Sequence, residues 1–206
     1  MNIGFIPGKW SRQTPQRDAV IDSTSGRRLT FGELDSAARK LANALLGLGL
    51  EKGDRVAILS MNSIEYCTLY FACGLAGLVV QPMNWRLAPS ELRRIIENGE
   101  PRVFITQGQY ADVAAEVSAM IDCVEHWLQY GDGGDGTYEH LVDRAADELP
   151  SCADTVGDDD PFCILYTGGT TGQSKGALHS HRSVNAMMFN QTVAERIVPS
   201  DVYLLT

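Results

Sequence analysis

The sequence has few cysteines, and they follow no pattern. Five cysteines are scattered over 206 residues, and no two of them form a C-x-x-C pair. An odd, unpatterned set excludes a disulfide framework and a zinc site built on paired cysteines, and it indicates reduced thiols of the kind found in the cytoplasm. Cys163 lies within an apolar run, and we expect it in the core.

Positive charge is also scarce. The chain has 17 Lys and Arg against 26 Asp and Glu, which gives a net charge of −9, and it contains no basic cluster. An acidic surface of this kind excludes nucleic acid and anionic membrane surfaces as partners. The sequence therefore points to partners that are small molecules, and it leaves an oligomer open.

Long apolar runs are missing as well. The longest uncharged apolar run covers residues 66–80, is closed by Gln81-Pro82 and is too short for a membrane span. We expect it to form a buried helix that continues into a strand. Residues 1–16 contain no apolar stretch of signal-peptide length, so we expect a cytoplasmic protein without a transmembrane segment.

What the sequence does contain is an alternation of strand and helix patterns. A hairpin is expected over residues 18–31, followed by a capping box in which Thr30 and Glu33 open a helix. Near-continuous apolar strands between amphipathic helices predict an α/β fold, a parallel sheet with helices on both faces. The strands are expected at residues 55–60, 78–80, 102–106 and 124–130, and the helices at 34–48, 62–75, 89–97, 111–120 and 138–148.

Residues 162–176 carry the strongest functional signal. An apolar run ends at Tyr166, and a loop of glycines, threonines and one lysine follows. Glycines let several backbone N–H groups converge on an anion, and the hydroxyls and the ammonium add donors suited to a polyphosphate. Residues after Gly176 are expected to form a helix, whose N-terminus would add partial positive charge. The predicted phosphate-binding residues are Thr167, Gly168, Gly169, Thr170, Thr171, Gly172 and Lys175.

The loop has a second interpretation, because a Gly/Thr-rich segment between a strand and a helix is often only a turn. It also differs from the usual nucleotide P-loop, since Ser174 precedes Lys175 and Gly176 follows it. Composition alone leaves the two interpretations open.

Three other segments attract attention and are interpreted structurally. Residues 131–136 match G-x-G-x-x-G, but two aspartates there would repel a pyrophosphate, so we expect a surface loop. Residues 149–160 are expected to form an exposed acidic linker whose last three aspartates are either solvated or a metal site. His179 and His181 are two apart, which does not place both on one helical face, and His181 is expected to cap or pack.

After the loop, the sequence predicts a helix over residues 180–190 and the beginning of a strand at 202–206. Met187 and Met188 are expected to fill the core.

Residues 166–176, YTGGTTGQSKG, resemble the signature loop of the adenylate-forming (AMP-binding) superfamily. Ser174 stands where that family most often has proline, which makes the loop less stiff. Residues 29–34, 53–58 and 80–87 resemble successive landmarks of the family's N-terminal domain. Asn84-Trp-Arg-Leu with Glu91 resembles the acyl-CoA synthetase branch.

The resemblance implies an ATP-dependent acyl-CoA synthetase, an acid–thiol ligase of fatty-acid metabolism. In that family a carboxylic acid reacts with ATP to an acyl-adenylate and pyrophosphate, and coenzyme A then displaces AMP. It implies catalytic roles for Lys175 and Thr170, and Mg²⁺ as cofactor without a metal ligand assigned in this chain. An enzyme that passes the acyl group to a carrier protein or an amine, and a non-catalytic nucleotide-binding module, stay open as alternatives.

The resemblance covers only the first part of the family's large domain. It implies that residues 1–206 are an N-terminal portion of that domain, with the linker at 149–160 inside it. The adenine-binding motifs, the acidic metal ligand and the C-terminal domain are expected to be absent, so we expect this portion alone to be inactive.

Overall fold

The computed structural model describes residues 1–131, 136–167 and 174–204. Its centre is a six-stranded sheet in the order β6-β5-β3-β4-β7-β8, and a separate two-stranded sheet pairs β1 with β2. The strands are β1 (Asp18–Ile21), β2 (Arg28–Thr30), β3 (Arg55–Leu59), β4 (Val79–Met83), β5 (Val103–Gln107), β6 (His126–Tyr130), β7 (Pro161–Thr167) and β8 (Lys175–Ser180).

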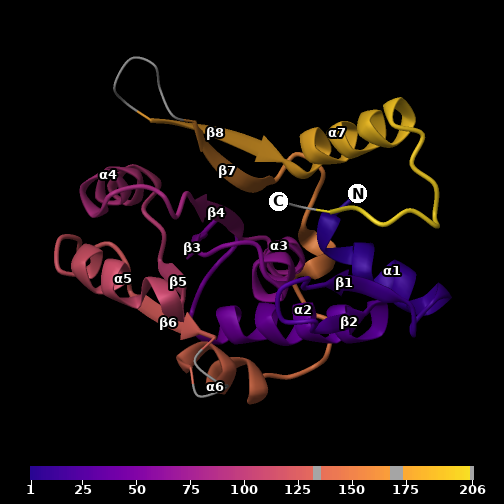
Figure 1. The fold of residues 1–206 in the computed structure, drawn as a ribbon, viewed down its shortest axis with the longest axis horizontal. Helices are drawn as coiled ribbons and strands as arrows, with labels where there is room; N and C mark the ends of the chain where they lie inside the picture. The colour runs from indigo at the N-terminus through magenta and orange to yellow at the C-terminus, as the bar shows by residue number, and fades with distance from the viewer. Residues whose placement is uncertain (132–135, 168–173, 205–206) are drawn as a thin grey trace.

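Helices cover both faces of the large sheet, as the alternating pattern predicted. Figure 1 shows α4 and α5 on one side of the strands and α2 and α3 on the other. The helices are α1 (Ile6–Gln13), α2 (Phe31–Gly47), α3 (Ile64–Ala76), α4 (Pro89–Gly99), α5 (Ala111–Ser118), α6 (Thr137–Asp143) and α7 (His181–Ala194), with 3₁₀ turns η1 (Ile3–Phe5), η2 (Gly108–Tyr110) and η3 (Ala153–Thr155).

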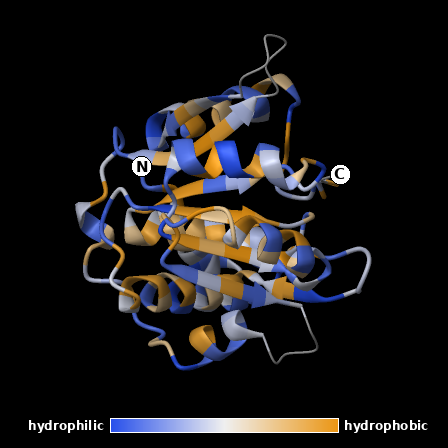
Figure 2. Ribbon diagram, turned by 90° about the vertical axis from the view of Figure 1, so that its left-hand side faces the viewer, coloured by the Kyte–Doolittle hydropathy of each residue, from blue (hydrophilic) through white to orange (hydrophobic). Residues whose placement is uncertain are grey.

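The two faces carry two cores because successive strand residues point to opposite sides. In β3, Val56 and Ile58 pack with α2 and α3, whereas Ala57 and Leu59 pack with α4 and α5. All four are at most 1% exposed. Figure 2 shows the hydrophobic residues concentrated along the strands and on the helix faces that meet them. The centre of the sheet at β3 is therefore buried on both sides.

Local signals set several element ends as expected. The Thr30 side chain accepts from the Glu33 backbone N–H, and Glu33 reaches back to the Thr30 N–H at 2.8 Å. The cap of α3 is Ser63, which accepts from the Tyr66 N–H, one residue later than the signal at residues 62–65 indicates. At the end of α4 the left-handed residue is Glu100, not Gly99, which sits inside the helix.

The chain after the signature loop departs from expectation. Strand β8 runs antiparallel to β7, with Thr167 opposite Lys175 and Pro161 opposite Ser180. Helix α7 begins at His181, after six strand residues that span about 20 Å. The prediction of a helix directly after Gly176 is wrong, and the N-terminus of α7 lies at the far end of β8 from Lys175.

Four smaller expectations are also corrected. Helix α6 ends at Asp143 rather than near residue 148. The segment 149–160 is not fully exposed, since Ala153 and Val156 are buried. Residues 202–204 form no strand. Met187 is 58% exposed, because it lies on the outer face of α7.

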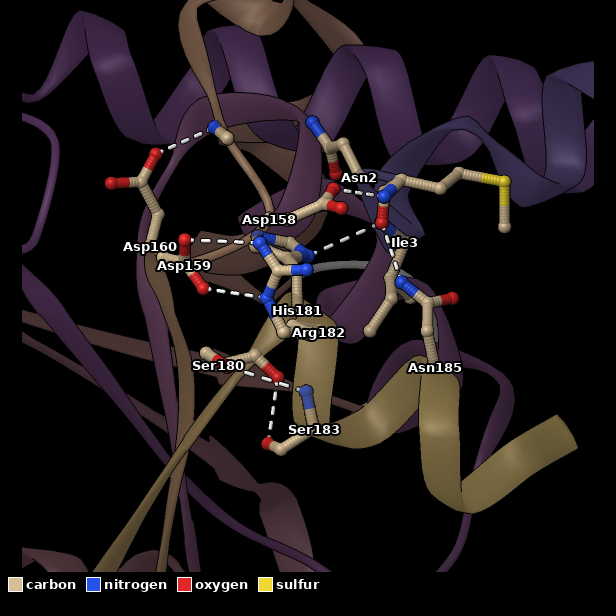
Figure 3. A network of polar contacts seen from close by, with 12 residues as sticks. Asn2, Ile3, Asp158, Asp159, Asp160, Ser180, His181, Arg182, Ser183 and Asn185 are labelled. Atoms are coloured by element: carbon tan, nitrogen blue, oxygen red, sulfur yellow. Dashed lines mark hydrogen bonds and ion pairs between the residues drawn. The ribbon is translucent and has the colours of Figure 1, made fainter. Parts of the chain in front are cut away.

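The first residues of the chain fix the start of α7. His181 is fully buried, its Nδ1 accepts from the Ile3 backbone N–H at 3.2 Å, and its ring lies 4.8 Å from that of Phe162. The Asn185 side chain donates to the Met1 carbonyl at 2.5 Å. Figure 3 shows these contacts between the N-terminal segment and α7. The expectation that His181 packs or caps rather than reacts agrees with this position.

Candidate functional site

The signature hairpin rises from the carboxyl end of β7. Its described residues place Thr167 and Lys175 opposite each other across the β7–β8 pair, and both side chains are exposed. Directly opposed residues of an antiparallel pair lie about 4.5–5.5 Å apart at Cα. A threonine hydroxyl and a lysine ammonium thus share the base of the hairpin. Lys175 makes no ion pair within the described ranges, which leaves its ammonium available to an anion.

The tip of the hairpin carries most of the predicted donors. Gly168, Gly169, Thr170, Thr171 and Gly172 lie outside the described residues. Their roles in phosphate binding, and the catalytic role of Thr170, stay predictions.

Tyr166 fixes the base of the hairpin to helix α4. Its hydroxyl donates to Asn98 Oδ1 at 2.7 Å, and its half-buried ring faces Gly176 on the opposite strand. A Cβ at Gly176 would lie 3.0 Å from Tyr166 Cζ and 2.8 Å from Ile164 Cδ1, so only glycine fits without displacing these side chains. Burial raises the pKa of Tyr166, which keeps the hydroxyl protonated as a donor. No sequence pattern indicates the Asn98 partner, which is 68 residues away in the chain.

A hollow of about 140 Å³ lies beside the hairpin. Its lining joins segments that are far apart in sequence, namely the end of β4, helix α4, β7 and the residue before β8. The lining residues are Pro82, Asn84, Leu87, Ile95, Leu165, Tyr166 and Ser174. Two of the segments singled out in the sequence, residues 84–87 and the signature loop, therefore meet at one edge of the sheet. The hollow is below the roughly 300 Å³ of a complete small-molecule site, so it can hold only part of a ligand.

An arginine stacks on an aromatic side chain at the same edge. The Arg86 guanidinium lies 4.0 Å from the centre of the Trp85 ring, and Trp85 lies 6.1 Å from the ring of Tyr110. Cation–π contact of this kind orients a guanidinium while leaving its donors free. Arg86 adds a second positive charge to the strand ends.

The described residues do not form a metal site. No group of three or more His, Cys, Asp or Glu is placed to hold an ion in the described part of the chain. The three aspartates at 158–160 are instead paired, with the N-terminal amine, Arg182 and Lys52 respectively. Each of their pKa values is lowered, first by the hydrogen bond to that cation. The lining of the hollow also contains no carboxylate, so these residues alone do not fit Mg²⁺.

Comparison with known families agrees with this geometry. The profile of the AMP-binding enzyme family matches residues 8–206, and the chain therefore belongs to this family of adenylate-forming enzymes.

Relatives place it among sequences named as CoA ligases. The chain is 35% identical over 188 residues to the long-chain-fatty-acid–CoA ligase FadD13 of Mycobacterium tuberculosis, covering 90% of this chain and 36% of the relative. It is 35% identical over 179 residues to a feruloyl-CoA synthase of an Amycolatopsis species, covering 87% and 33%. The crystal structure of ATP-bound MatB from Rhodopseudomonas palustris superposes with a TM-score of 0.79 at 30% identity, covering 98% of this chain and 39% of MatB. The chain thus spans about a third of the length of the curated relatives it matches.

Proposed function

We propose that this chain supplies the ATP-phosphate site of an ATP-dependent acyl-CoA synthetase. The observation that carries the proposal is the β7–β8 hairpin, where Thr167 and Lys175 face each other at the carboxyl end of parallel strands, and Lys175 has no ion-pair partner among the described residues. Ligands of open α/β sheets bind at this edge. Support comes from the two CoA ligases described above and from a relative solved with ATP bound.

The reaction has two steps. A carboxylate oxygen of the acid attacks the α-phosphorus of ATP, the bond to the β-phosphate oxygen breaks, and pyrophosphate leaves with the electron pair. The thiolate of coenzyme A then attacks the acyl carbon, and AMP leaves as the thioester forms. Both steps bring anions together, so positive charge and donors must be in place before reaction.

The residues of this chain act on the departing phosphates. Lys175 and the Thr167 hydroxyl would bind the β- and γ-phosphates, and the loop donors, Thr170 among them, would meet charge that develops on pyrophosphate. Interactions that strengthen as charge develops lower the barrier rather than only tightening substrate binding. Mg²⁺, when bound, would neutralise phosphate charge, with ligands from outside the described residues. Tyr166, tied to Asn98, keeps the hairpin base in register with the sheet.

The substrate acid is proposed only as a class. The relatives are named for a long-chain fatty acid and for ferulate, so a fatty or similar carboxylic acid fits, with coenzyme A as the thiol. No helix among the described residues is both long and apolar enough to cross a membrane. We propose a cytoplasmic enzyme.

Product analysis tests the proposal on the longer protein that contains this chain. The protein is incubated with ATP, coenzyme A and a panel of acetate, medium- and long-chain fatty acids and benzoates, and AMP and thioester are quantified. We expect AMP and acyl-CoA in equal amounts with one class of acid. Acyl-adenylate without acyl-CoA would move the acceptor to a carrier protein or an amine, and ATP binding without any acid-dependent product would favour a non-catalytic module.

A further inference from the structure

A second, larger hollow lies away from the signature hairpin. It has a volume of about 510 Å³, within the range of about 300–1,000 Å³ typical of small-molecule sites. In Figure 1, α6 and the end of β6 lie at the opposite end of the molecule from the β7–β8 hairpin. The lining comes from α2, α3, α6, the β1–β2 hairpin and the residue after β6: Arg27, Leu29, Ala37, Ile64, Glu65, Thr68, Gly131, Tyr138, Glu139, Val142 and Asp143.

Two polar groups face this hollow with hydrogen-bonding capacity unused. Glu65, in the first turn of α3, has a side chain only 13% exposed, and one of its oxygens pairs with Arg27 Nη1 at 2.9 Å. Its other oxygen has no hydrogen bond within the described ranges. Tyr138, in α6, is 7% exposed, and its hydroxyl likewise makes no hydrogen bond among the described residues. Both groups line the hollow, where a ligand would find these hydrogen-bonding positions free.

The charge of the lining is negative. Glu65, Glu139 and Asp143 outnumber the single cation, Arg27, which is itself 59% exposed. Glu139 Oε1 accepts from the Gly131 N–H at 3.2 Å, and its Oε2 is buried without a partner. ATP, a carboxylic acid and coenzyme A are all anions, so this hollow repels every substrate of the proposed reaction.

Most of the remaining wall is apolar and comes from helices and a strand. Leu29, Ala37, Ile64 and Val142 come from β2, α2, α3 and α6. A ligand therefore needs an apolar body for these side chains and a positive hydrogen-bond donor for the carboxylates.

We propose that the hollow between α2, α3 and α6 binds a small organic cation, with an ammonium group held by the free oxygen of Glu65 and the Tyr138 hydroxyl and an alkyl chain against the apolar wall. Burial and the charge of Glu65 raise the pKa of Tyr138, so the hydroxyl stays neutral and accepts from the ammonium. The site is independent of the signature hairpin and goes beyond the proposed function.

Calorimetric titration of the chain with n-hexylamine, which is protonated at pH 7, tests the proposal. 1-Hexanol is the matched neutral probe. We expect hexylamine to bind at least about tenfold more tightly than hexanol, which corresponds to one good charge-assisted contact. Equal affinity for the two probes would overturn the proposal, since the hollow would then select only for apolar volume.

Variants locate the binding. Glu65→Gln is expected to weaken hexylamine binding about tenfold, and Tyr138→Phe about threefold to tenfold. Asp143→Asn, at an exposed position that folding does not need, is expected to weaken it about twofold to fivefold. Glu116→Gln, on the exposed face of α5, is the control and should leave it unchanged. If the Glu116 variant lost as much affinity for hexylamine as the Glu65 and Asp143 variants, the amine would be bound only by nonspecific attraction to the acidic surface. That result would refute the site.

Discussion

Replacing His181 tests how the N-terminal segment holds α7 behind the signature hairpin. The imidazole is fully buried and accepts one hydrogen bond from the Ile3 N–H, and its buried Nε2 has no partner in the part of the chain that the structure describes. Because Nδ1 accepts, the neutral ring must carry its proton on Nε2. A second proton on Nδ1 would break the bond to Ile3 and bury a charge.

The size of the pH-dependent loss of stability follows from the burial of His181. Burial lowers the pKa of His181 from its ordinary value of 6.5. Among the charged groups that face it, Asp160 and Asp158 oppose the shift, while the N-terminal amine and Lys52 add to it. When the folded pKa is below the unfolded one, the unfolded chain binds more protons as pH falls, so stability is lost below pH 6.5. The loss of folding free energy at pH 5.5 is at most about 1.4 kcal/mol, the limit that a ring neutral throughout in the folded state would reach.

The assay is urea unfolding of the chain and of His181→Leu at pH 7.5 and pH 5.5. Leucine keeps most of the volume and removes the titrating group, so titration of all other groups cancels in the comparison. Relative to the variant, the unmodified chain should lose stability over this interval, by no more than about 1.4 kcal/mol. His181→Ala should in addition lose about 2–5 kcal/mol at pH 7.5, because it leaves a cavity against Phe162. Parallel loss of stability in the chain and the leucine variant would refute the buried neutral ring.

Three further substitutions have simple expected outcomes in the same unfolding assay. Thr30→Ala removes the N-cap of α2 and should lower the free energy of unfolding by about 1 kcal/mol. An unchanged free energy of unfolding would mean that packing alone stabilises α2. Gly4→Ala would place a Cβ against the backbone nitrogen of Leu75 and should lower the free energy of unfolding by more than about 1 kcal/mol. A smaller loss would contradict the close contact between η1 and α3. Tyr166→Phe loses the bond to Asn98 and should cost about 0.5–1.5 kcal/mol; a neutral result would show that the bond is not maintained in solution.

Sequence patterns sufficed where local and tertiary preferences agree. The buried strand at residues 55–59 was predictable because an apolar run of strand length fits a central strand in a sheet that helices cover on both faces. The cap at Thr30 was predictable because capping depends on residues close in sequence. For these elements the expected and observed structures differ by only a residue or two at the ends.

The features that the sequence did not predict depend on contacts between residues far apart in the chain. Residues 175–180 carry only one large aliphatic side chain and form an edge strand that is mostly exposed, so no alternating pattern marks it. It is a strand because β7 supplies a partner. Ala153 is buried because Asn2 and α3 approach it, with Asn2 Nδ2 3.4 Å from its carbonyl, which no local pattern reveals. The bond between Tyr166 and Asn98 joins residues 68 apart in sequence and is likewise invisible in the chain order.

The most direct test of the central claim is acid-dependent ATP–pyrophosphate exchange by the longer protein, with Lys175→Ala and a matched control, Lys40→Ala. Lys40 lies on α2, which covers a different part of the sheet. Loss of one charge-assisted contact to the phosphates should lower exchange by about tenfold to 150-fold in the Lys175 variant, and the Lys40 variant should match the unmodified enzyme. Exchange that is equal in all three would contradict the assignment of the β7–β8 hairpin as the ATP-phosphate site.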